Sequence, residues 1–343
     1  MNNYYLFPFL ILFFYILNYI FKRNNILLDK IESSKHKKFL ISDNVPLSGG
    51  ILILIAIIFF VNEITILDKV LFSIIFLVGL SSDLQKLKSP LVRLILQFFV
   101  ILIFLILSKD FVIQIRISYF DYLLENFTVF KLLFTLFCLL ILINGTNFID
   151  GLNGLCSGYF IVVIINLLIV ALNSGLTYGN NNLEVLLQFL FVFLIFNLLS
   201  KSFLGDSGSY LIGTYIGLFL IHFFDEYNNL VSPYFICLLL WYPAFENLFS
   251  ISRRILRKNE VSEPDNKHLH QLIFLFIKSK EIFEDKKINS ASSIIILILN
   301  LPSFVLSSLL ATHSQILLFI ILMNIILYIL IYNFISKNLK INK

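Results

Sequence analysis

Long apolar runs, almost free of charge, dominate this sequence and restrict it to a helical membrane protein. At least ten runs of 16 or more residues contain hardly any charged side chain. Each is long enough to cross a hydrocarbon core of about 30 Å as a helix. Apolar residues make up 59% of the chain and charged residues only 14%, unlike a soluble domain. The runs do not alternate between polar and apolar residues, which excludes a transmembrane β-barrel.

We therefore expect an all-α, polytopic transmembrane bundle of about 11 helices (10 or 11), forming a single domain over residues 1–343. The expected spans share an apolar stretch that ends in a polar loop, and they cover residues 4–21, 47–62, 66–82, 91–108, 128–144, 155–172, 184–200, 207–224, 231–249, 291–310 and 315–336. The first is interpreted as a retained helix rather than a signal peptide, because Lys22 and Arg23 follow its apolar run.

The basic residues predict the orientation of these helices. With the N-terminus outside and the C-terminus in the cytoplasm, 22 of the 26 Lys and Arg residues face the cytoplasm, as the positive-inside rule requires. The four on the outer side are Lys69, Lys109, Arg116 and Lys131. The cytoplasmic loops then cover about residues 22–46, 83–90, 145–154, 200–206 and 250–290. A net charge of +5 suits an anionic leaflet and anionic substrates rather than nucleic acid.

Several other segments have simple interpretations. In the loop 250–290, apolar residues at helical spacing, from Leu269 to Phe276, predict a helix at the membrane interface. The outer segment 108–128 is expected to form a short strand or turn. The three cysteines share no close spacing, so neither a disulfide framework nor a metal site is expected. His222 and His313 lie at outer helix ends and are interpreted as structural.

Two cytoplasmic segments bring carboxylates and amides to the membrane border. Residues 79–84 (GLSSDL) place Asp83 at the end of an expected helix, where interfacial anchoring is the simpler alternative. Further along, Asn144, Asn147 and Asp150 share one helical face because they are three residues apart. Their oxygens are of the hard type that Mg²⁺ prefers. Helix capping with a glycine turn is the alternative for this second segment.

Two later segments add an acid and a pair of histidines. Asp206, within residues 203–213 (FLGDSGSYLIG), either caps the helix that follows or helps to hold a metal-bound diphosphate at its positive end. Residues 264–271 (PDNKHLHQ) contain His268 and His270 without a Cys or third ligand at zinc spacing. These histidines suit phosphate binding or proton transfer better.

In this order, the four segments resemble those of the polyprenyl-phosphate N-acetylhexosamine-1-phosphate transferase family (glycosyltransferase family 4). The resemblance extends from residues 46–50 (PLSGG) to His270. The Pro-Asp-x-x-His-Leu-His segment of the chain is similar to the form found in the branch that uses simple UDP-sugars. It implies a phosphotransferase in the bacterial inner membrane, with its active site facing the cytoplasm. The implied reaction transfers a sugar-1-phosphate from a UDP-sugar to undecaprenyl phosphate and releases UMP, which begins O-antigen, capsule or related glycan synthesis. The implied partners are these two substrates and membrane lipids. A homodimer is one alternative for the oligomeric state.

The resemblance also implies roles for individual residues. It places Mg²⁺, with Mn²⁺ as the alternative, on Asn147 and Asp206, and catalytic carboxylates at Asp83, Asp150 and Asp206. Phe203 corresponds to an aromatic residue that stacks on uracil. The implied substrate-binding residues surround the nucleotide, the diphosphate or the lipid phosphate, and they are Asn144, Asn153, Phe203, Lys86, Arg253, Arg254, Asp265, His268 and His270.

Three positions depart from the family pattern. Ser82 stands where the first acid of an Asp-Asp pair is usual, Gln271 replaces a frequent third His, and Glu246 occupies a common Asp position. The missing acid is often proposed to deprotonate the lipid phosphate. A phosphate monoester with a second pKa of about 6 is already largely dianionic at neutral pH. The loss of the acid at position 82 therefore does not imply an inactive protein.

Alternatives remain beside an active transferase. One is a non-catalytic relative that binds lipid-linked intermediates, and another is the muramyl-pentapeptide phosphate transferase of peptidoglycan synthesis. A transporter is disfavoured because the expected spans carry few ionisable residues at mid-depth.

Overall fold

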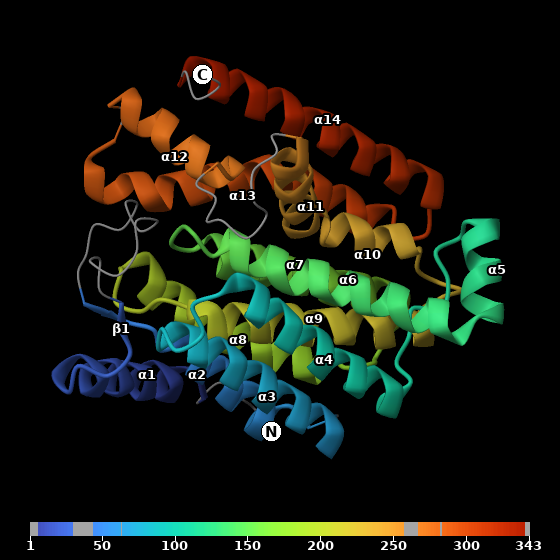
Figure 1. Ribbon diagram of the computed structural model, residues 1–343, viewed down its shortest axis with the longest axis horizontal. Helices are drawn as coiled ribbons and strands as arrows, with labels where there is room; N and C mark the ends of the chain where they lie inside the picture. The colour runs from blue at the N-terminus through green and yellow to red at the C-terminus, as the bar shows by residue number, and fades with distance from the viewer. Residues whose placement is uncertain (1–5, 30–43, 63, 257–266, 282, 340–343) are drawn as a thin grey trace.

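The computed structural model (Figure 1) describes residues 6–29, 44–62, 64–256, 267–281 and 283–339. Within these residues the chain forms helices joined by loops, together with one short antiparallel pair of strands. The elements follow one another as α1 (Leu6–Arg23), β1 (Leu28–Asp29), β2 (Val45–Pro46), α2 (Gly49–Ile55), the π-helix η3 (Ala56–Phe60), α3 (Ile66–Asp83), α4 (Pro90–Ser108), α5 (Ser118–Asn126), α6 (Thr128–Ile149), α7 (Leu155–Ser174), α8 (Asn180–Leu198), α9 (Gly205–Tyr227), α10 (Pro233–Leu239), α11 (Trp241–Leu256), α12 (Leu269–Ser279), α13 (Asp285–Leu309) and α14 (Ser314–Asn338).

This architecture confirms the predicted all-α polytopic bundle. Seven of the described helices are long and apolar enough to cross a membrane, or eight if α10 and α11 count as one bent span. Each of the eleven expected spans overlaps a helix or a pair of helices. The long helices run roughly side by side across the view in Figure 1, with α5 at one end of the bundle and α12 toward the other.

The expected span 47–62 is shorter and less regular than the sequence suggested. Its helical part, α2 and η3 together, covers only Gly49–Phe60. At a rise of about 1.5 Å per residue, this helix is too short to cross a hydrocarbon core alone. It packs instead against α8 and α9 inside the bundle.

The expected span 231–249 is broken into α10 and α11, whose axes meet at 72°. Pro243 lies near the start of α11 and has no N–H to donate to the carbonyl of Leu239 four residues earlier. The Tyr159 hydroxyl donates to that Leu239 carbonyl instead, at 2.8 Å. The break is therefore explained by proline chemistry, and the freed acceptor is satisfied by a neighbouring helix.

Two shorter helices lie outside the expected spans. The outer segment 108–128 contains the helix α5, so the expectation of a strand or turn there was wrong. The predicted helix in the loop 250–290 is confirmed as α12, which packs against α13 and α14. Its Leu269, Leu272 and Ile273 are buried in the protein.

Helix α9 forms the centre of the bundle. Of its most apolar 18 residues 89% are buried, against 11% for α14, and it packs against α2, α3 and α6. Glycines permit the close approach: a Cβ on Gly79 of α3 would lie 2.4 Å from the Cα of Ser207. A Cβ on Gly213 would lie 2.9 Å from the Cα of Ile143 in α6. These contacts bring the ends of α3, α6 and α9 together.

We predict that Gly79→Ala destabilises the protein by about 1–3 kcal/mol, because the added methyl group meets backbone rather than a movable side chain. The melting temperature of the purified chain in detergent measures the effect. Ser73→Ala on the same helix is the control, since the Ser73 hydroxyl bonds only to Lys69 O of its own helix, and we expect it to cost less than about 0.5 kcal/mol. Equal melting temperatures for the two variants would show that α3 and α9 are not in close contact.

Candidate active site

Asp206 lies in the first turn of α9 and is the centre of a polar cluster at one end of the bundle. The Asn147 amide nitrogen donates to Oδ1 of Asp206 at 2.7 Å. The Arg93 guanidinium and the Ser82 hydroxyl both donate to Oδ2. Gly205 precedes Asp206 with φ +75°, a conformation that glycine adopts without strain. Helix α9 thus supplies the carboxylate, and α3, α4 and α6 each supply one side chain that donates to it.

Asp83 holds the N-terminus of α9 from outside that helix. Its Oδ1 accepts the backbone N–H of Asp206 at 2.8 Å. Its Oδ2 accepts the backbone N–H of Ser207 at 3.1 Å and the Ser207 hydroxyl at 2.7 Å. First-turn N–H groups have no partner within their own helix, so a carboxylate placed there acts as a cap. Asp83 therefore caps α9, a role different from the interfacial anchoring suggested as the simpler alternative.

Asp150 follows α6 and lies close to the same cluster. Its half-buried carboxylate has no hydrogen-bond or ion-pair partner among the described residues. Burial raises the pKa of Asp150, and the negative charges of Asp206 and Asp83 raise it further. Within the described residues, these three neighbouring carboxyl groups thus lie beside one guanidinium, that of Arg93. Such an excess of negative charge favours the approach of a cation.

The oxygen donors of this cluster fit a magnesium ion in their chemistry. No three His, Cys, Asp or Glu side chains in the described parts of the chain are close enough to hold one ion together. Magnesium, however, is commonly bound through one or two carboxylates, with water and substrate phosphates completing its shell. Asp206, the neighbouring Asn147 and the unpartnered Asp150 supply that number of protein donors.

The asparagines on either side of this cluster are held by neighbours. The Asn144 amide donates to Gln97 Oε1 at 3.2 Å, while the buried Gln97 Nε2 has no hydrogen-bond partner in the part of the chain that the structure describes. The Asn153 amide donates to Ser200 Oγ at 2.8 Å, and its backbone N–H donates to Asn289 Oδ1 at 2.6 Å. Asn153 thus ties the loop after α6 to the loop after α8 and to α13.

Two predicted binding residues lie at the edge of the cluster. Phe203 is 8% exposed and packs on Val45 and Leu47. Its backbone accepts from Gly49 N–H and donates to the Pro46 carbonyl, which fastens the start of α2 beside α9. Lys86 is exposed after the end of α3. The stacking of uracil on Phe203 and the phosphate-binding role of Lys86 remain predictions.

The histidine segment forms a second, buried cluster around Glu246 of α11. His268 Nδ1 lies 2.9 Å from Glu246 Oε1, and the Leu269 backbone N–H donates to the same oxygen at 3.2 Å. The Tyr328 hydroxyl of α14 donates to Oε2 at 2.8 Å. Glu246 is fully buried, so these contacts compensate for removing its charge from water. Three helices are joined at this one side chain.

The segment between Asn147 and Gly151 joins the two clusters. Asn147 bonds to Asp206, whereas the ring of Phe148 lies 4.8 Å from that of His268. A Cβ on Gly151 would lie 2.5 Å from His270 Nε2. The histidine segment is thereby held against the same loop that carries Asp150.

His270 is fully buried, and neither of its ring nitrogens has a hydrogen-bond partner among the described residues. Its ring stacks on that of His268 at 5.6 Å. Burial, together with the nearby His268, lowers the pKa of His270 to about 3, although Glu246 opposes the shift. The imidazole is therefore neutral near pH 7 and offers one donor and one acceptor.

The predicted phosphate-binding arginines occupy different environments. Arg253 is buried and donates to the Lys267 carbonyl and, at 2.7 Å, to the Tyr332 hydroxyl. Its guanidinium also lies 5.8 Å from the centre of the Phe249 ring. Arg254, the next residue of α11, is half-buried. Asp265 lies outside the described residues.

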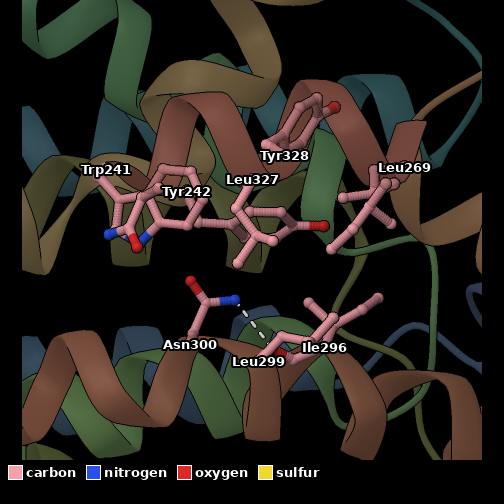
Figure 2. Close-up of a pocket in the computed structure, with 10 residues that line it drawn as sticks. Trp241, Tyr242, Leu269, Ile296, Leu299, Asn300, Leu327 and Tyr328 are labelled. Carbon is pink, nitrogen blue, oxygen red and sulfur yellow. Dashed lines mark hydrogen bonds between the residues drawn. The ribbon is translucent and has the colours of Figure 1, made fainter. Parts of the chain in front are cut away.

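A small cavity lies beside the Glu246 cluster, where α10 meets α11 (Figure 2). It has a volume of about 30 Å³, which is room for one or two water molecules. Three polar atoms of its lining are buried without a hydrogen-bond partner in the described chain: Trp241 Nε1, the Tyr242 hydroxyl and Asn300 Oδ1. Asn300 Nδ2 donates to the Ile296 carbonyl of its own helix, the dashed bond in Figure 2.

Several site residues were not singled out in the sequence. Arg93 was counted only as a basic residue near the membrane, although it bonds to Asp206. Glu246 and Ser82 were noted as departures, without a partner for either. The spacing of Ser82 and Arg93, eleven residues apart across a turn, was a usable signal because such a turn brings adjacent antiparallel helix ends together.

Comparison with known proteins supports the resemblance. Residues 65–224 match glycosyl transferase family 4. The probable undecaprenyl-phosphate N-acetylglucosaminyl 1-phosphate transferase of Bacillus subtilis (strain 168) is 31% identical over 134 residues, 39% of this chain and 37% of the relative. The undecaprenyl-phosphate alpha-N-acetylglucosaminyl 1-phosphate transferase of Thermotoga maritima is 33% identical over 132 residues, 38% of this chain and 39% of the relative.

A third relative aligns over more of the chain at a lower identity. The phospho-N-acetylmuramoyl-pentapeptide-transferase of Dictyoglomus thermophilum is 27% identical over 223 residues, 61% of this chain and 69% of the relative. The chain spans less than two fifths of the length of the first two relatives. The match to the family nevertheless contains Asp83, Asn147, Asp150 and Asp206, so it includes four of the predicted site residues.

We predict that Asp83→Ala lowers the free energy of unfolding by about 1–2 kcal/mol, as expected when a helix cap is lost. Asp83→Asn keeps one carbonyl acceptor and should cost less. Melting temperatures in detergent distinguish these outcomes without any substrate. If Asp83→Ala melts at the same temperature as the natural chain, then Asp83 does not cap α9.

The buried His270 predicts a loss of stability in acid. Because its pKa is about 3 in the folded chain against an ordinary value of 6.5, the unfolded chain takes up the proton first. The contribution to stability is complete above pH 6.5 and falls by about 1.4 kcal/mol per pH unit between pH 6.5 and 3.

Melting curves at pH 7.5, 6.5 and 5.5 measure this loss. His270→Gln, which removes the titrating group, should lose less stability over the same interval. Parallel curves for the two proteins would contradict a neutral, buried His270.

Proposed function

We propose that this chain, whose residues 65–224 belong to glycosyl transferase family 4, is a membrane phosphotransferase. In the proposed reaction, N-acetylhexosamine-1-phosphate passes from a UDP-sugar to undecaprenyl phosphate, and UMP is released. The product would begin a cell-envelope glycan such as O-antigen or capsule. The proposed site faces the cytoplasm of a bacterial cell at the inner membrane.

The observation that supports this proposal most directly is the cluster at the N-terminus of α9. Asp206, Asn147 and the neighbouring Asp150 offer oxygen donors, and Arg93 offers a guanidinium, at one end of an apolar bundle. A phosphotransferase must bring two anionic substrates together and neutralise the charge that develops between them. An acidic cluster with an arginine beside it is suited to this task when a divalent cation is bound.

A magnesium ion on Asp206 and Asn147 would neutralise the diphosphate of the nucleotide sugar and polarise the phosphorus for attack. Arg93 donates to Asp206 through Nη1, whereas its Nη2 has no hydrogen-bond partner among the described residues and is not one of the buried unpartnered atoms. The guanidinium therefore retains donor capacity for a phosphate oxygen. The cap from Asp83 keeps the first turn of α9, and with it Asp206, in a fixed position.

The proposed nucleophile needs no carboxylate base at position 82. A lipid phosphate is largely dianionic at neutral pH, because its second pKa is about 6. Ser82 donates its hydroxyl to Asp206 and accepts from Arg93 at 2.7 Å. It thus completes the hydrogen-bonded cluster and leaves Asp206 with one like charge fewer beside it.

A second candidate is transfer of muramyl-pentapeptide phosphate to the same lipid. It is favoured by the long alignment with the relative from Dictyoglomus thermophilum. The Pro-Asp-x-x-His-Leu-His segment favours the simple UDP-sugar instead. A panel of both donors separates the two.

We predict that the purified chain with Mg²⁺, undecaprenyl phosphate and a UDP-N-acetylhexosamine releases UMP. Asp206→Asn should reduce the rate by about 10²–10³-fold or more, because the central carboxylate is neutralised. Glu226→Gln, an exposed acid near the other end of the same helix, is the matched control and should leave the rate unchanged. Chromatographic separation of UMP and mass spectrometry of the lipid product provide the measurement.

This assay distinguishes a preference for another donor from a complete absence of turnover. Turnover with UDP-muramyl-pentapeptide alone would support the second candidate. Binding of a UDP-sugar without any turnover across the panel would contradict transferase activity and support a non-catalytic relative.

A further inference from the structure

The three helices that contribute Arg93, Asn147 and Asp206 also meet at their opposite ends. Sixteen positions separate Arg93 from Lys109 along α4 and its cap, Asn147 from Lys131 along α6, and Asp206 from His222 along α9. At about 1.5 Å per residue, each separation is about 24 Å. This is slightly less than a hydrocarbon core of about 30 Å, so the two groups of polar residues lie near opposite borders of the apolar layer.

A cavity of about 130 Å³ lies at this far end. Its lining combines charged side chains with apolar ones, and it consists of Lys109, Asp110, Phe111, Ile113, Lys131, Ile221, His222 and Asp225. Two of the four basic residues assigned to the outer side by the charge count therefore line a single cavity. Lysines at a membrane border usually extend toward water, whereas these two line the same cavity.

The charges that line the cavity are only partly paired. His222 Nε2 lies 3.0 Å from Asp110 Oδ1, and both side chains are partly exposed. The ammonium groups of Lys109 and Lys131, in contrast, have no hydrogen-bond or ion-pair partner within the described residues, and neither has the exposed carboxylate of Asp225. The cavity thus offers two free cationic donors and one free anionic acceptor.

We propose that this cavity binds the headgroup of a zwitterionic phospholipid that carries a primary amine. Its phosphate lies against Lys109 and Lys131, and its ammonium group lies near Asp225. Each unpaired charge in the cavity then gains a partner of opposite sign, at the depth where headgroups lie. A headgroup without the amine leaves Asp225 beside a phosphate, and a quaternary amine has no N–H to donate. Because the cavity lies across the membrane from the proposed active site, this inference does not rest on the proposed reaction.

Native mass spectrometry of the full chain in detergent tests the proposal. The probes are short-chain phosphatidylethanolamine, phosphatidylglycerol and phosphatidylcholine, with inorganic phosphate as the soluble source of the same group. We expect phosphatidylethanolamine to bind more tightly than the other lipids. Lys131→Gln should weaken its binding about fivefold, the loss expected for one lysine near a headgroup.

Two further variants make the test specific. Lys69→Gln removes another outer lysine that does not line the cavity, and it should bind the lipid as the natural chain does. Asp225→Asn should shift the preference from phosphatidylethanolamine toward phosphatidylglycerol. Equal elution volumes and melting temperatures of the lipid-free variants verify that each one is folded.

Three results of these measurements would contradict lipid binding at the cavity. Equal weakening by Lys131→Gln and Lys69→Gln, or binding of inorganic phosphate as tight as that of lipid, would overturn the proposal. An unchanged headgroup preference in Asp225→Asn would overturn it as well.

Discussion

The geometry of the site depends on the bonds between the Asp83 carboxylate and the first N–H groups of α9. Asp206 belongs to the same turn, so the cap determines where the central carboxylate lies. The approach of α3 to α9 is possible because Gly79 presents no Cβ to Ser207. A backbone contact and a carboxylate cap thus act together, and the position of Asp206 follows from both. Arg93 and Asn147 then reach it from α4 and α6.

A second dependence joins the histidine segment to this site. Glu246 is buried and binds the start of α12 through His268 Nδ1 and the Leu269 N–H, while Tyr328 connects it to α14. The loop after α6 lies between the two clusters, with Gly151 against His270. We therefore expect that a movement of one cluster displaces the other through the short, well-packed loop after α6. The described chain thus presents one continuous polar region at this end of the bundle.

The sequence predicts the helical spans well because apolar length is a strong local signal, and the motif residues Asp83, Asn147, Asp150 and Asp206 do gather at one end. It predicts their partners poorly, because a partner such as Arg93 or Glu246 is decided by how separate helices pack. The break between α10 and α11 at Leu240 had a local signal in Pro243, but that proline lies within an apolar run that was interpreted as one span. The burial of Phe203 against Val45 and Leu47 had none, since those residues lie more than 150 positions apart.

The central claim is that Asp206 and its neighbours hold a divalent cation against the diphosphate of a nucleotide sugar. Electron–nuclear double resonance of Mn²⁺, added to the purified chain with a UDP-N-acetylhexosamine, tests it without requiring turnover. We expect a phosphorus hyperfine coupling to protein-bound Mn²⁺ that is present in the natural chain and lost in Asp206→Asn. Absence of protein-bound Mn²⁺, or a phosphorus coupling that persists unchanged in Asp206→Asn, would contradict it.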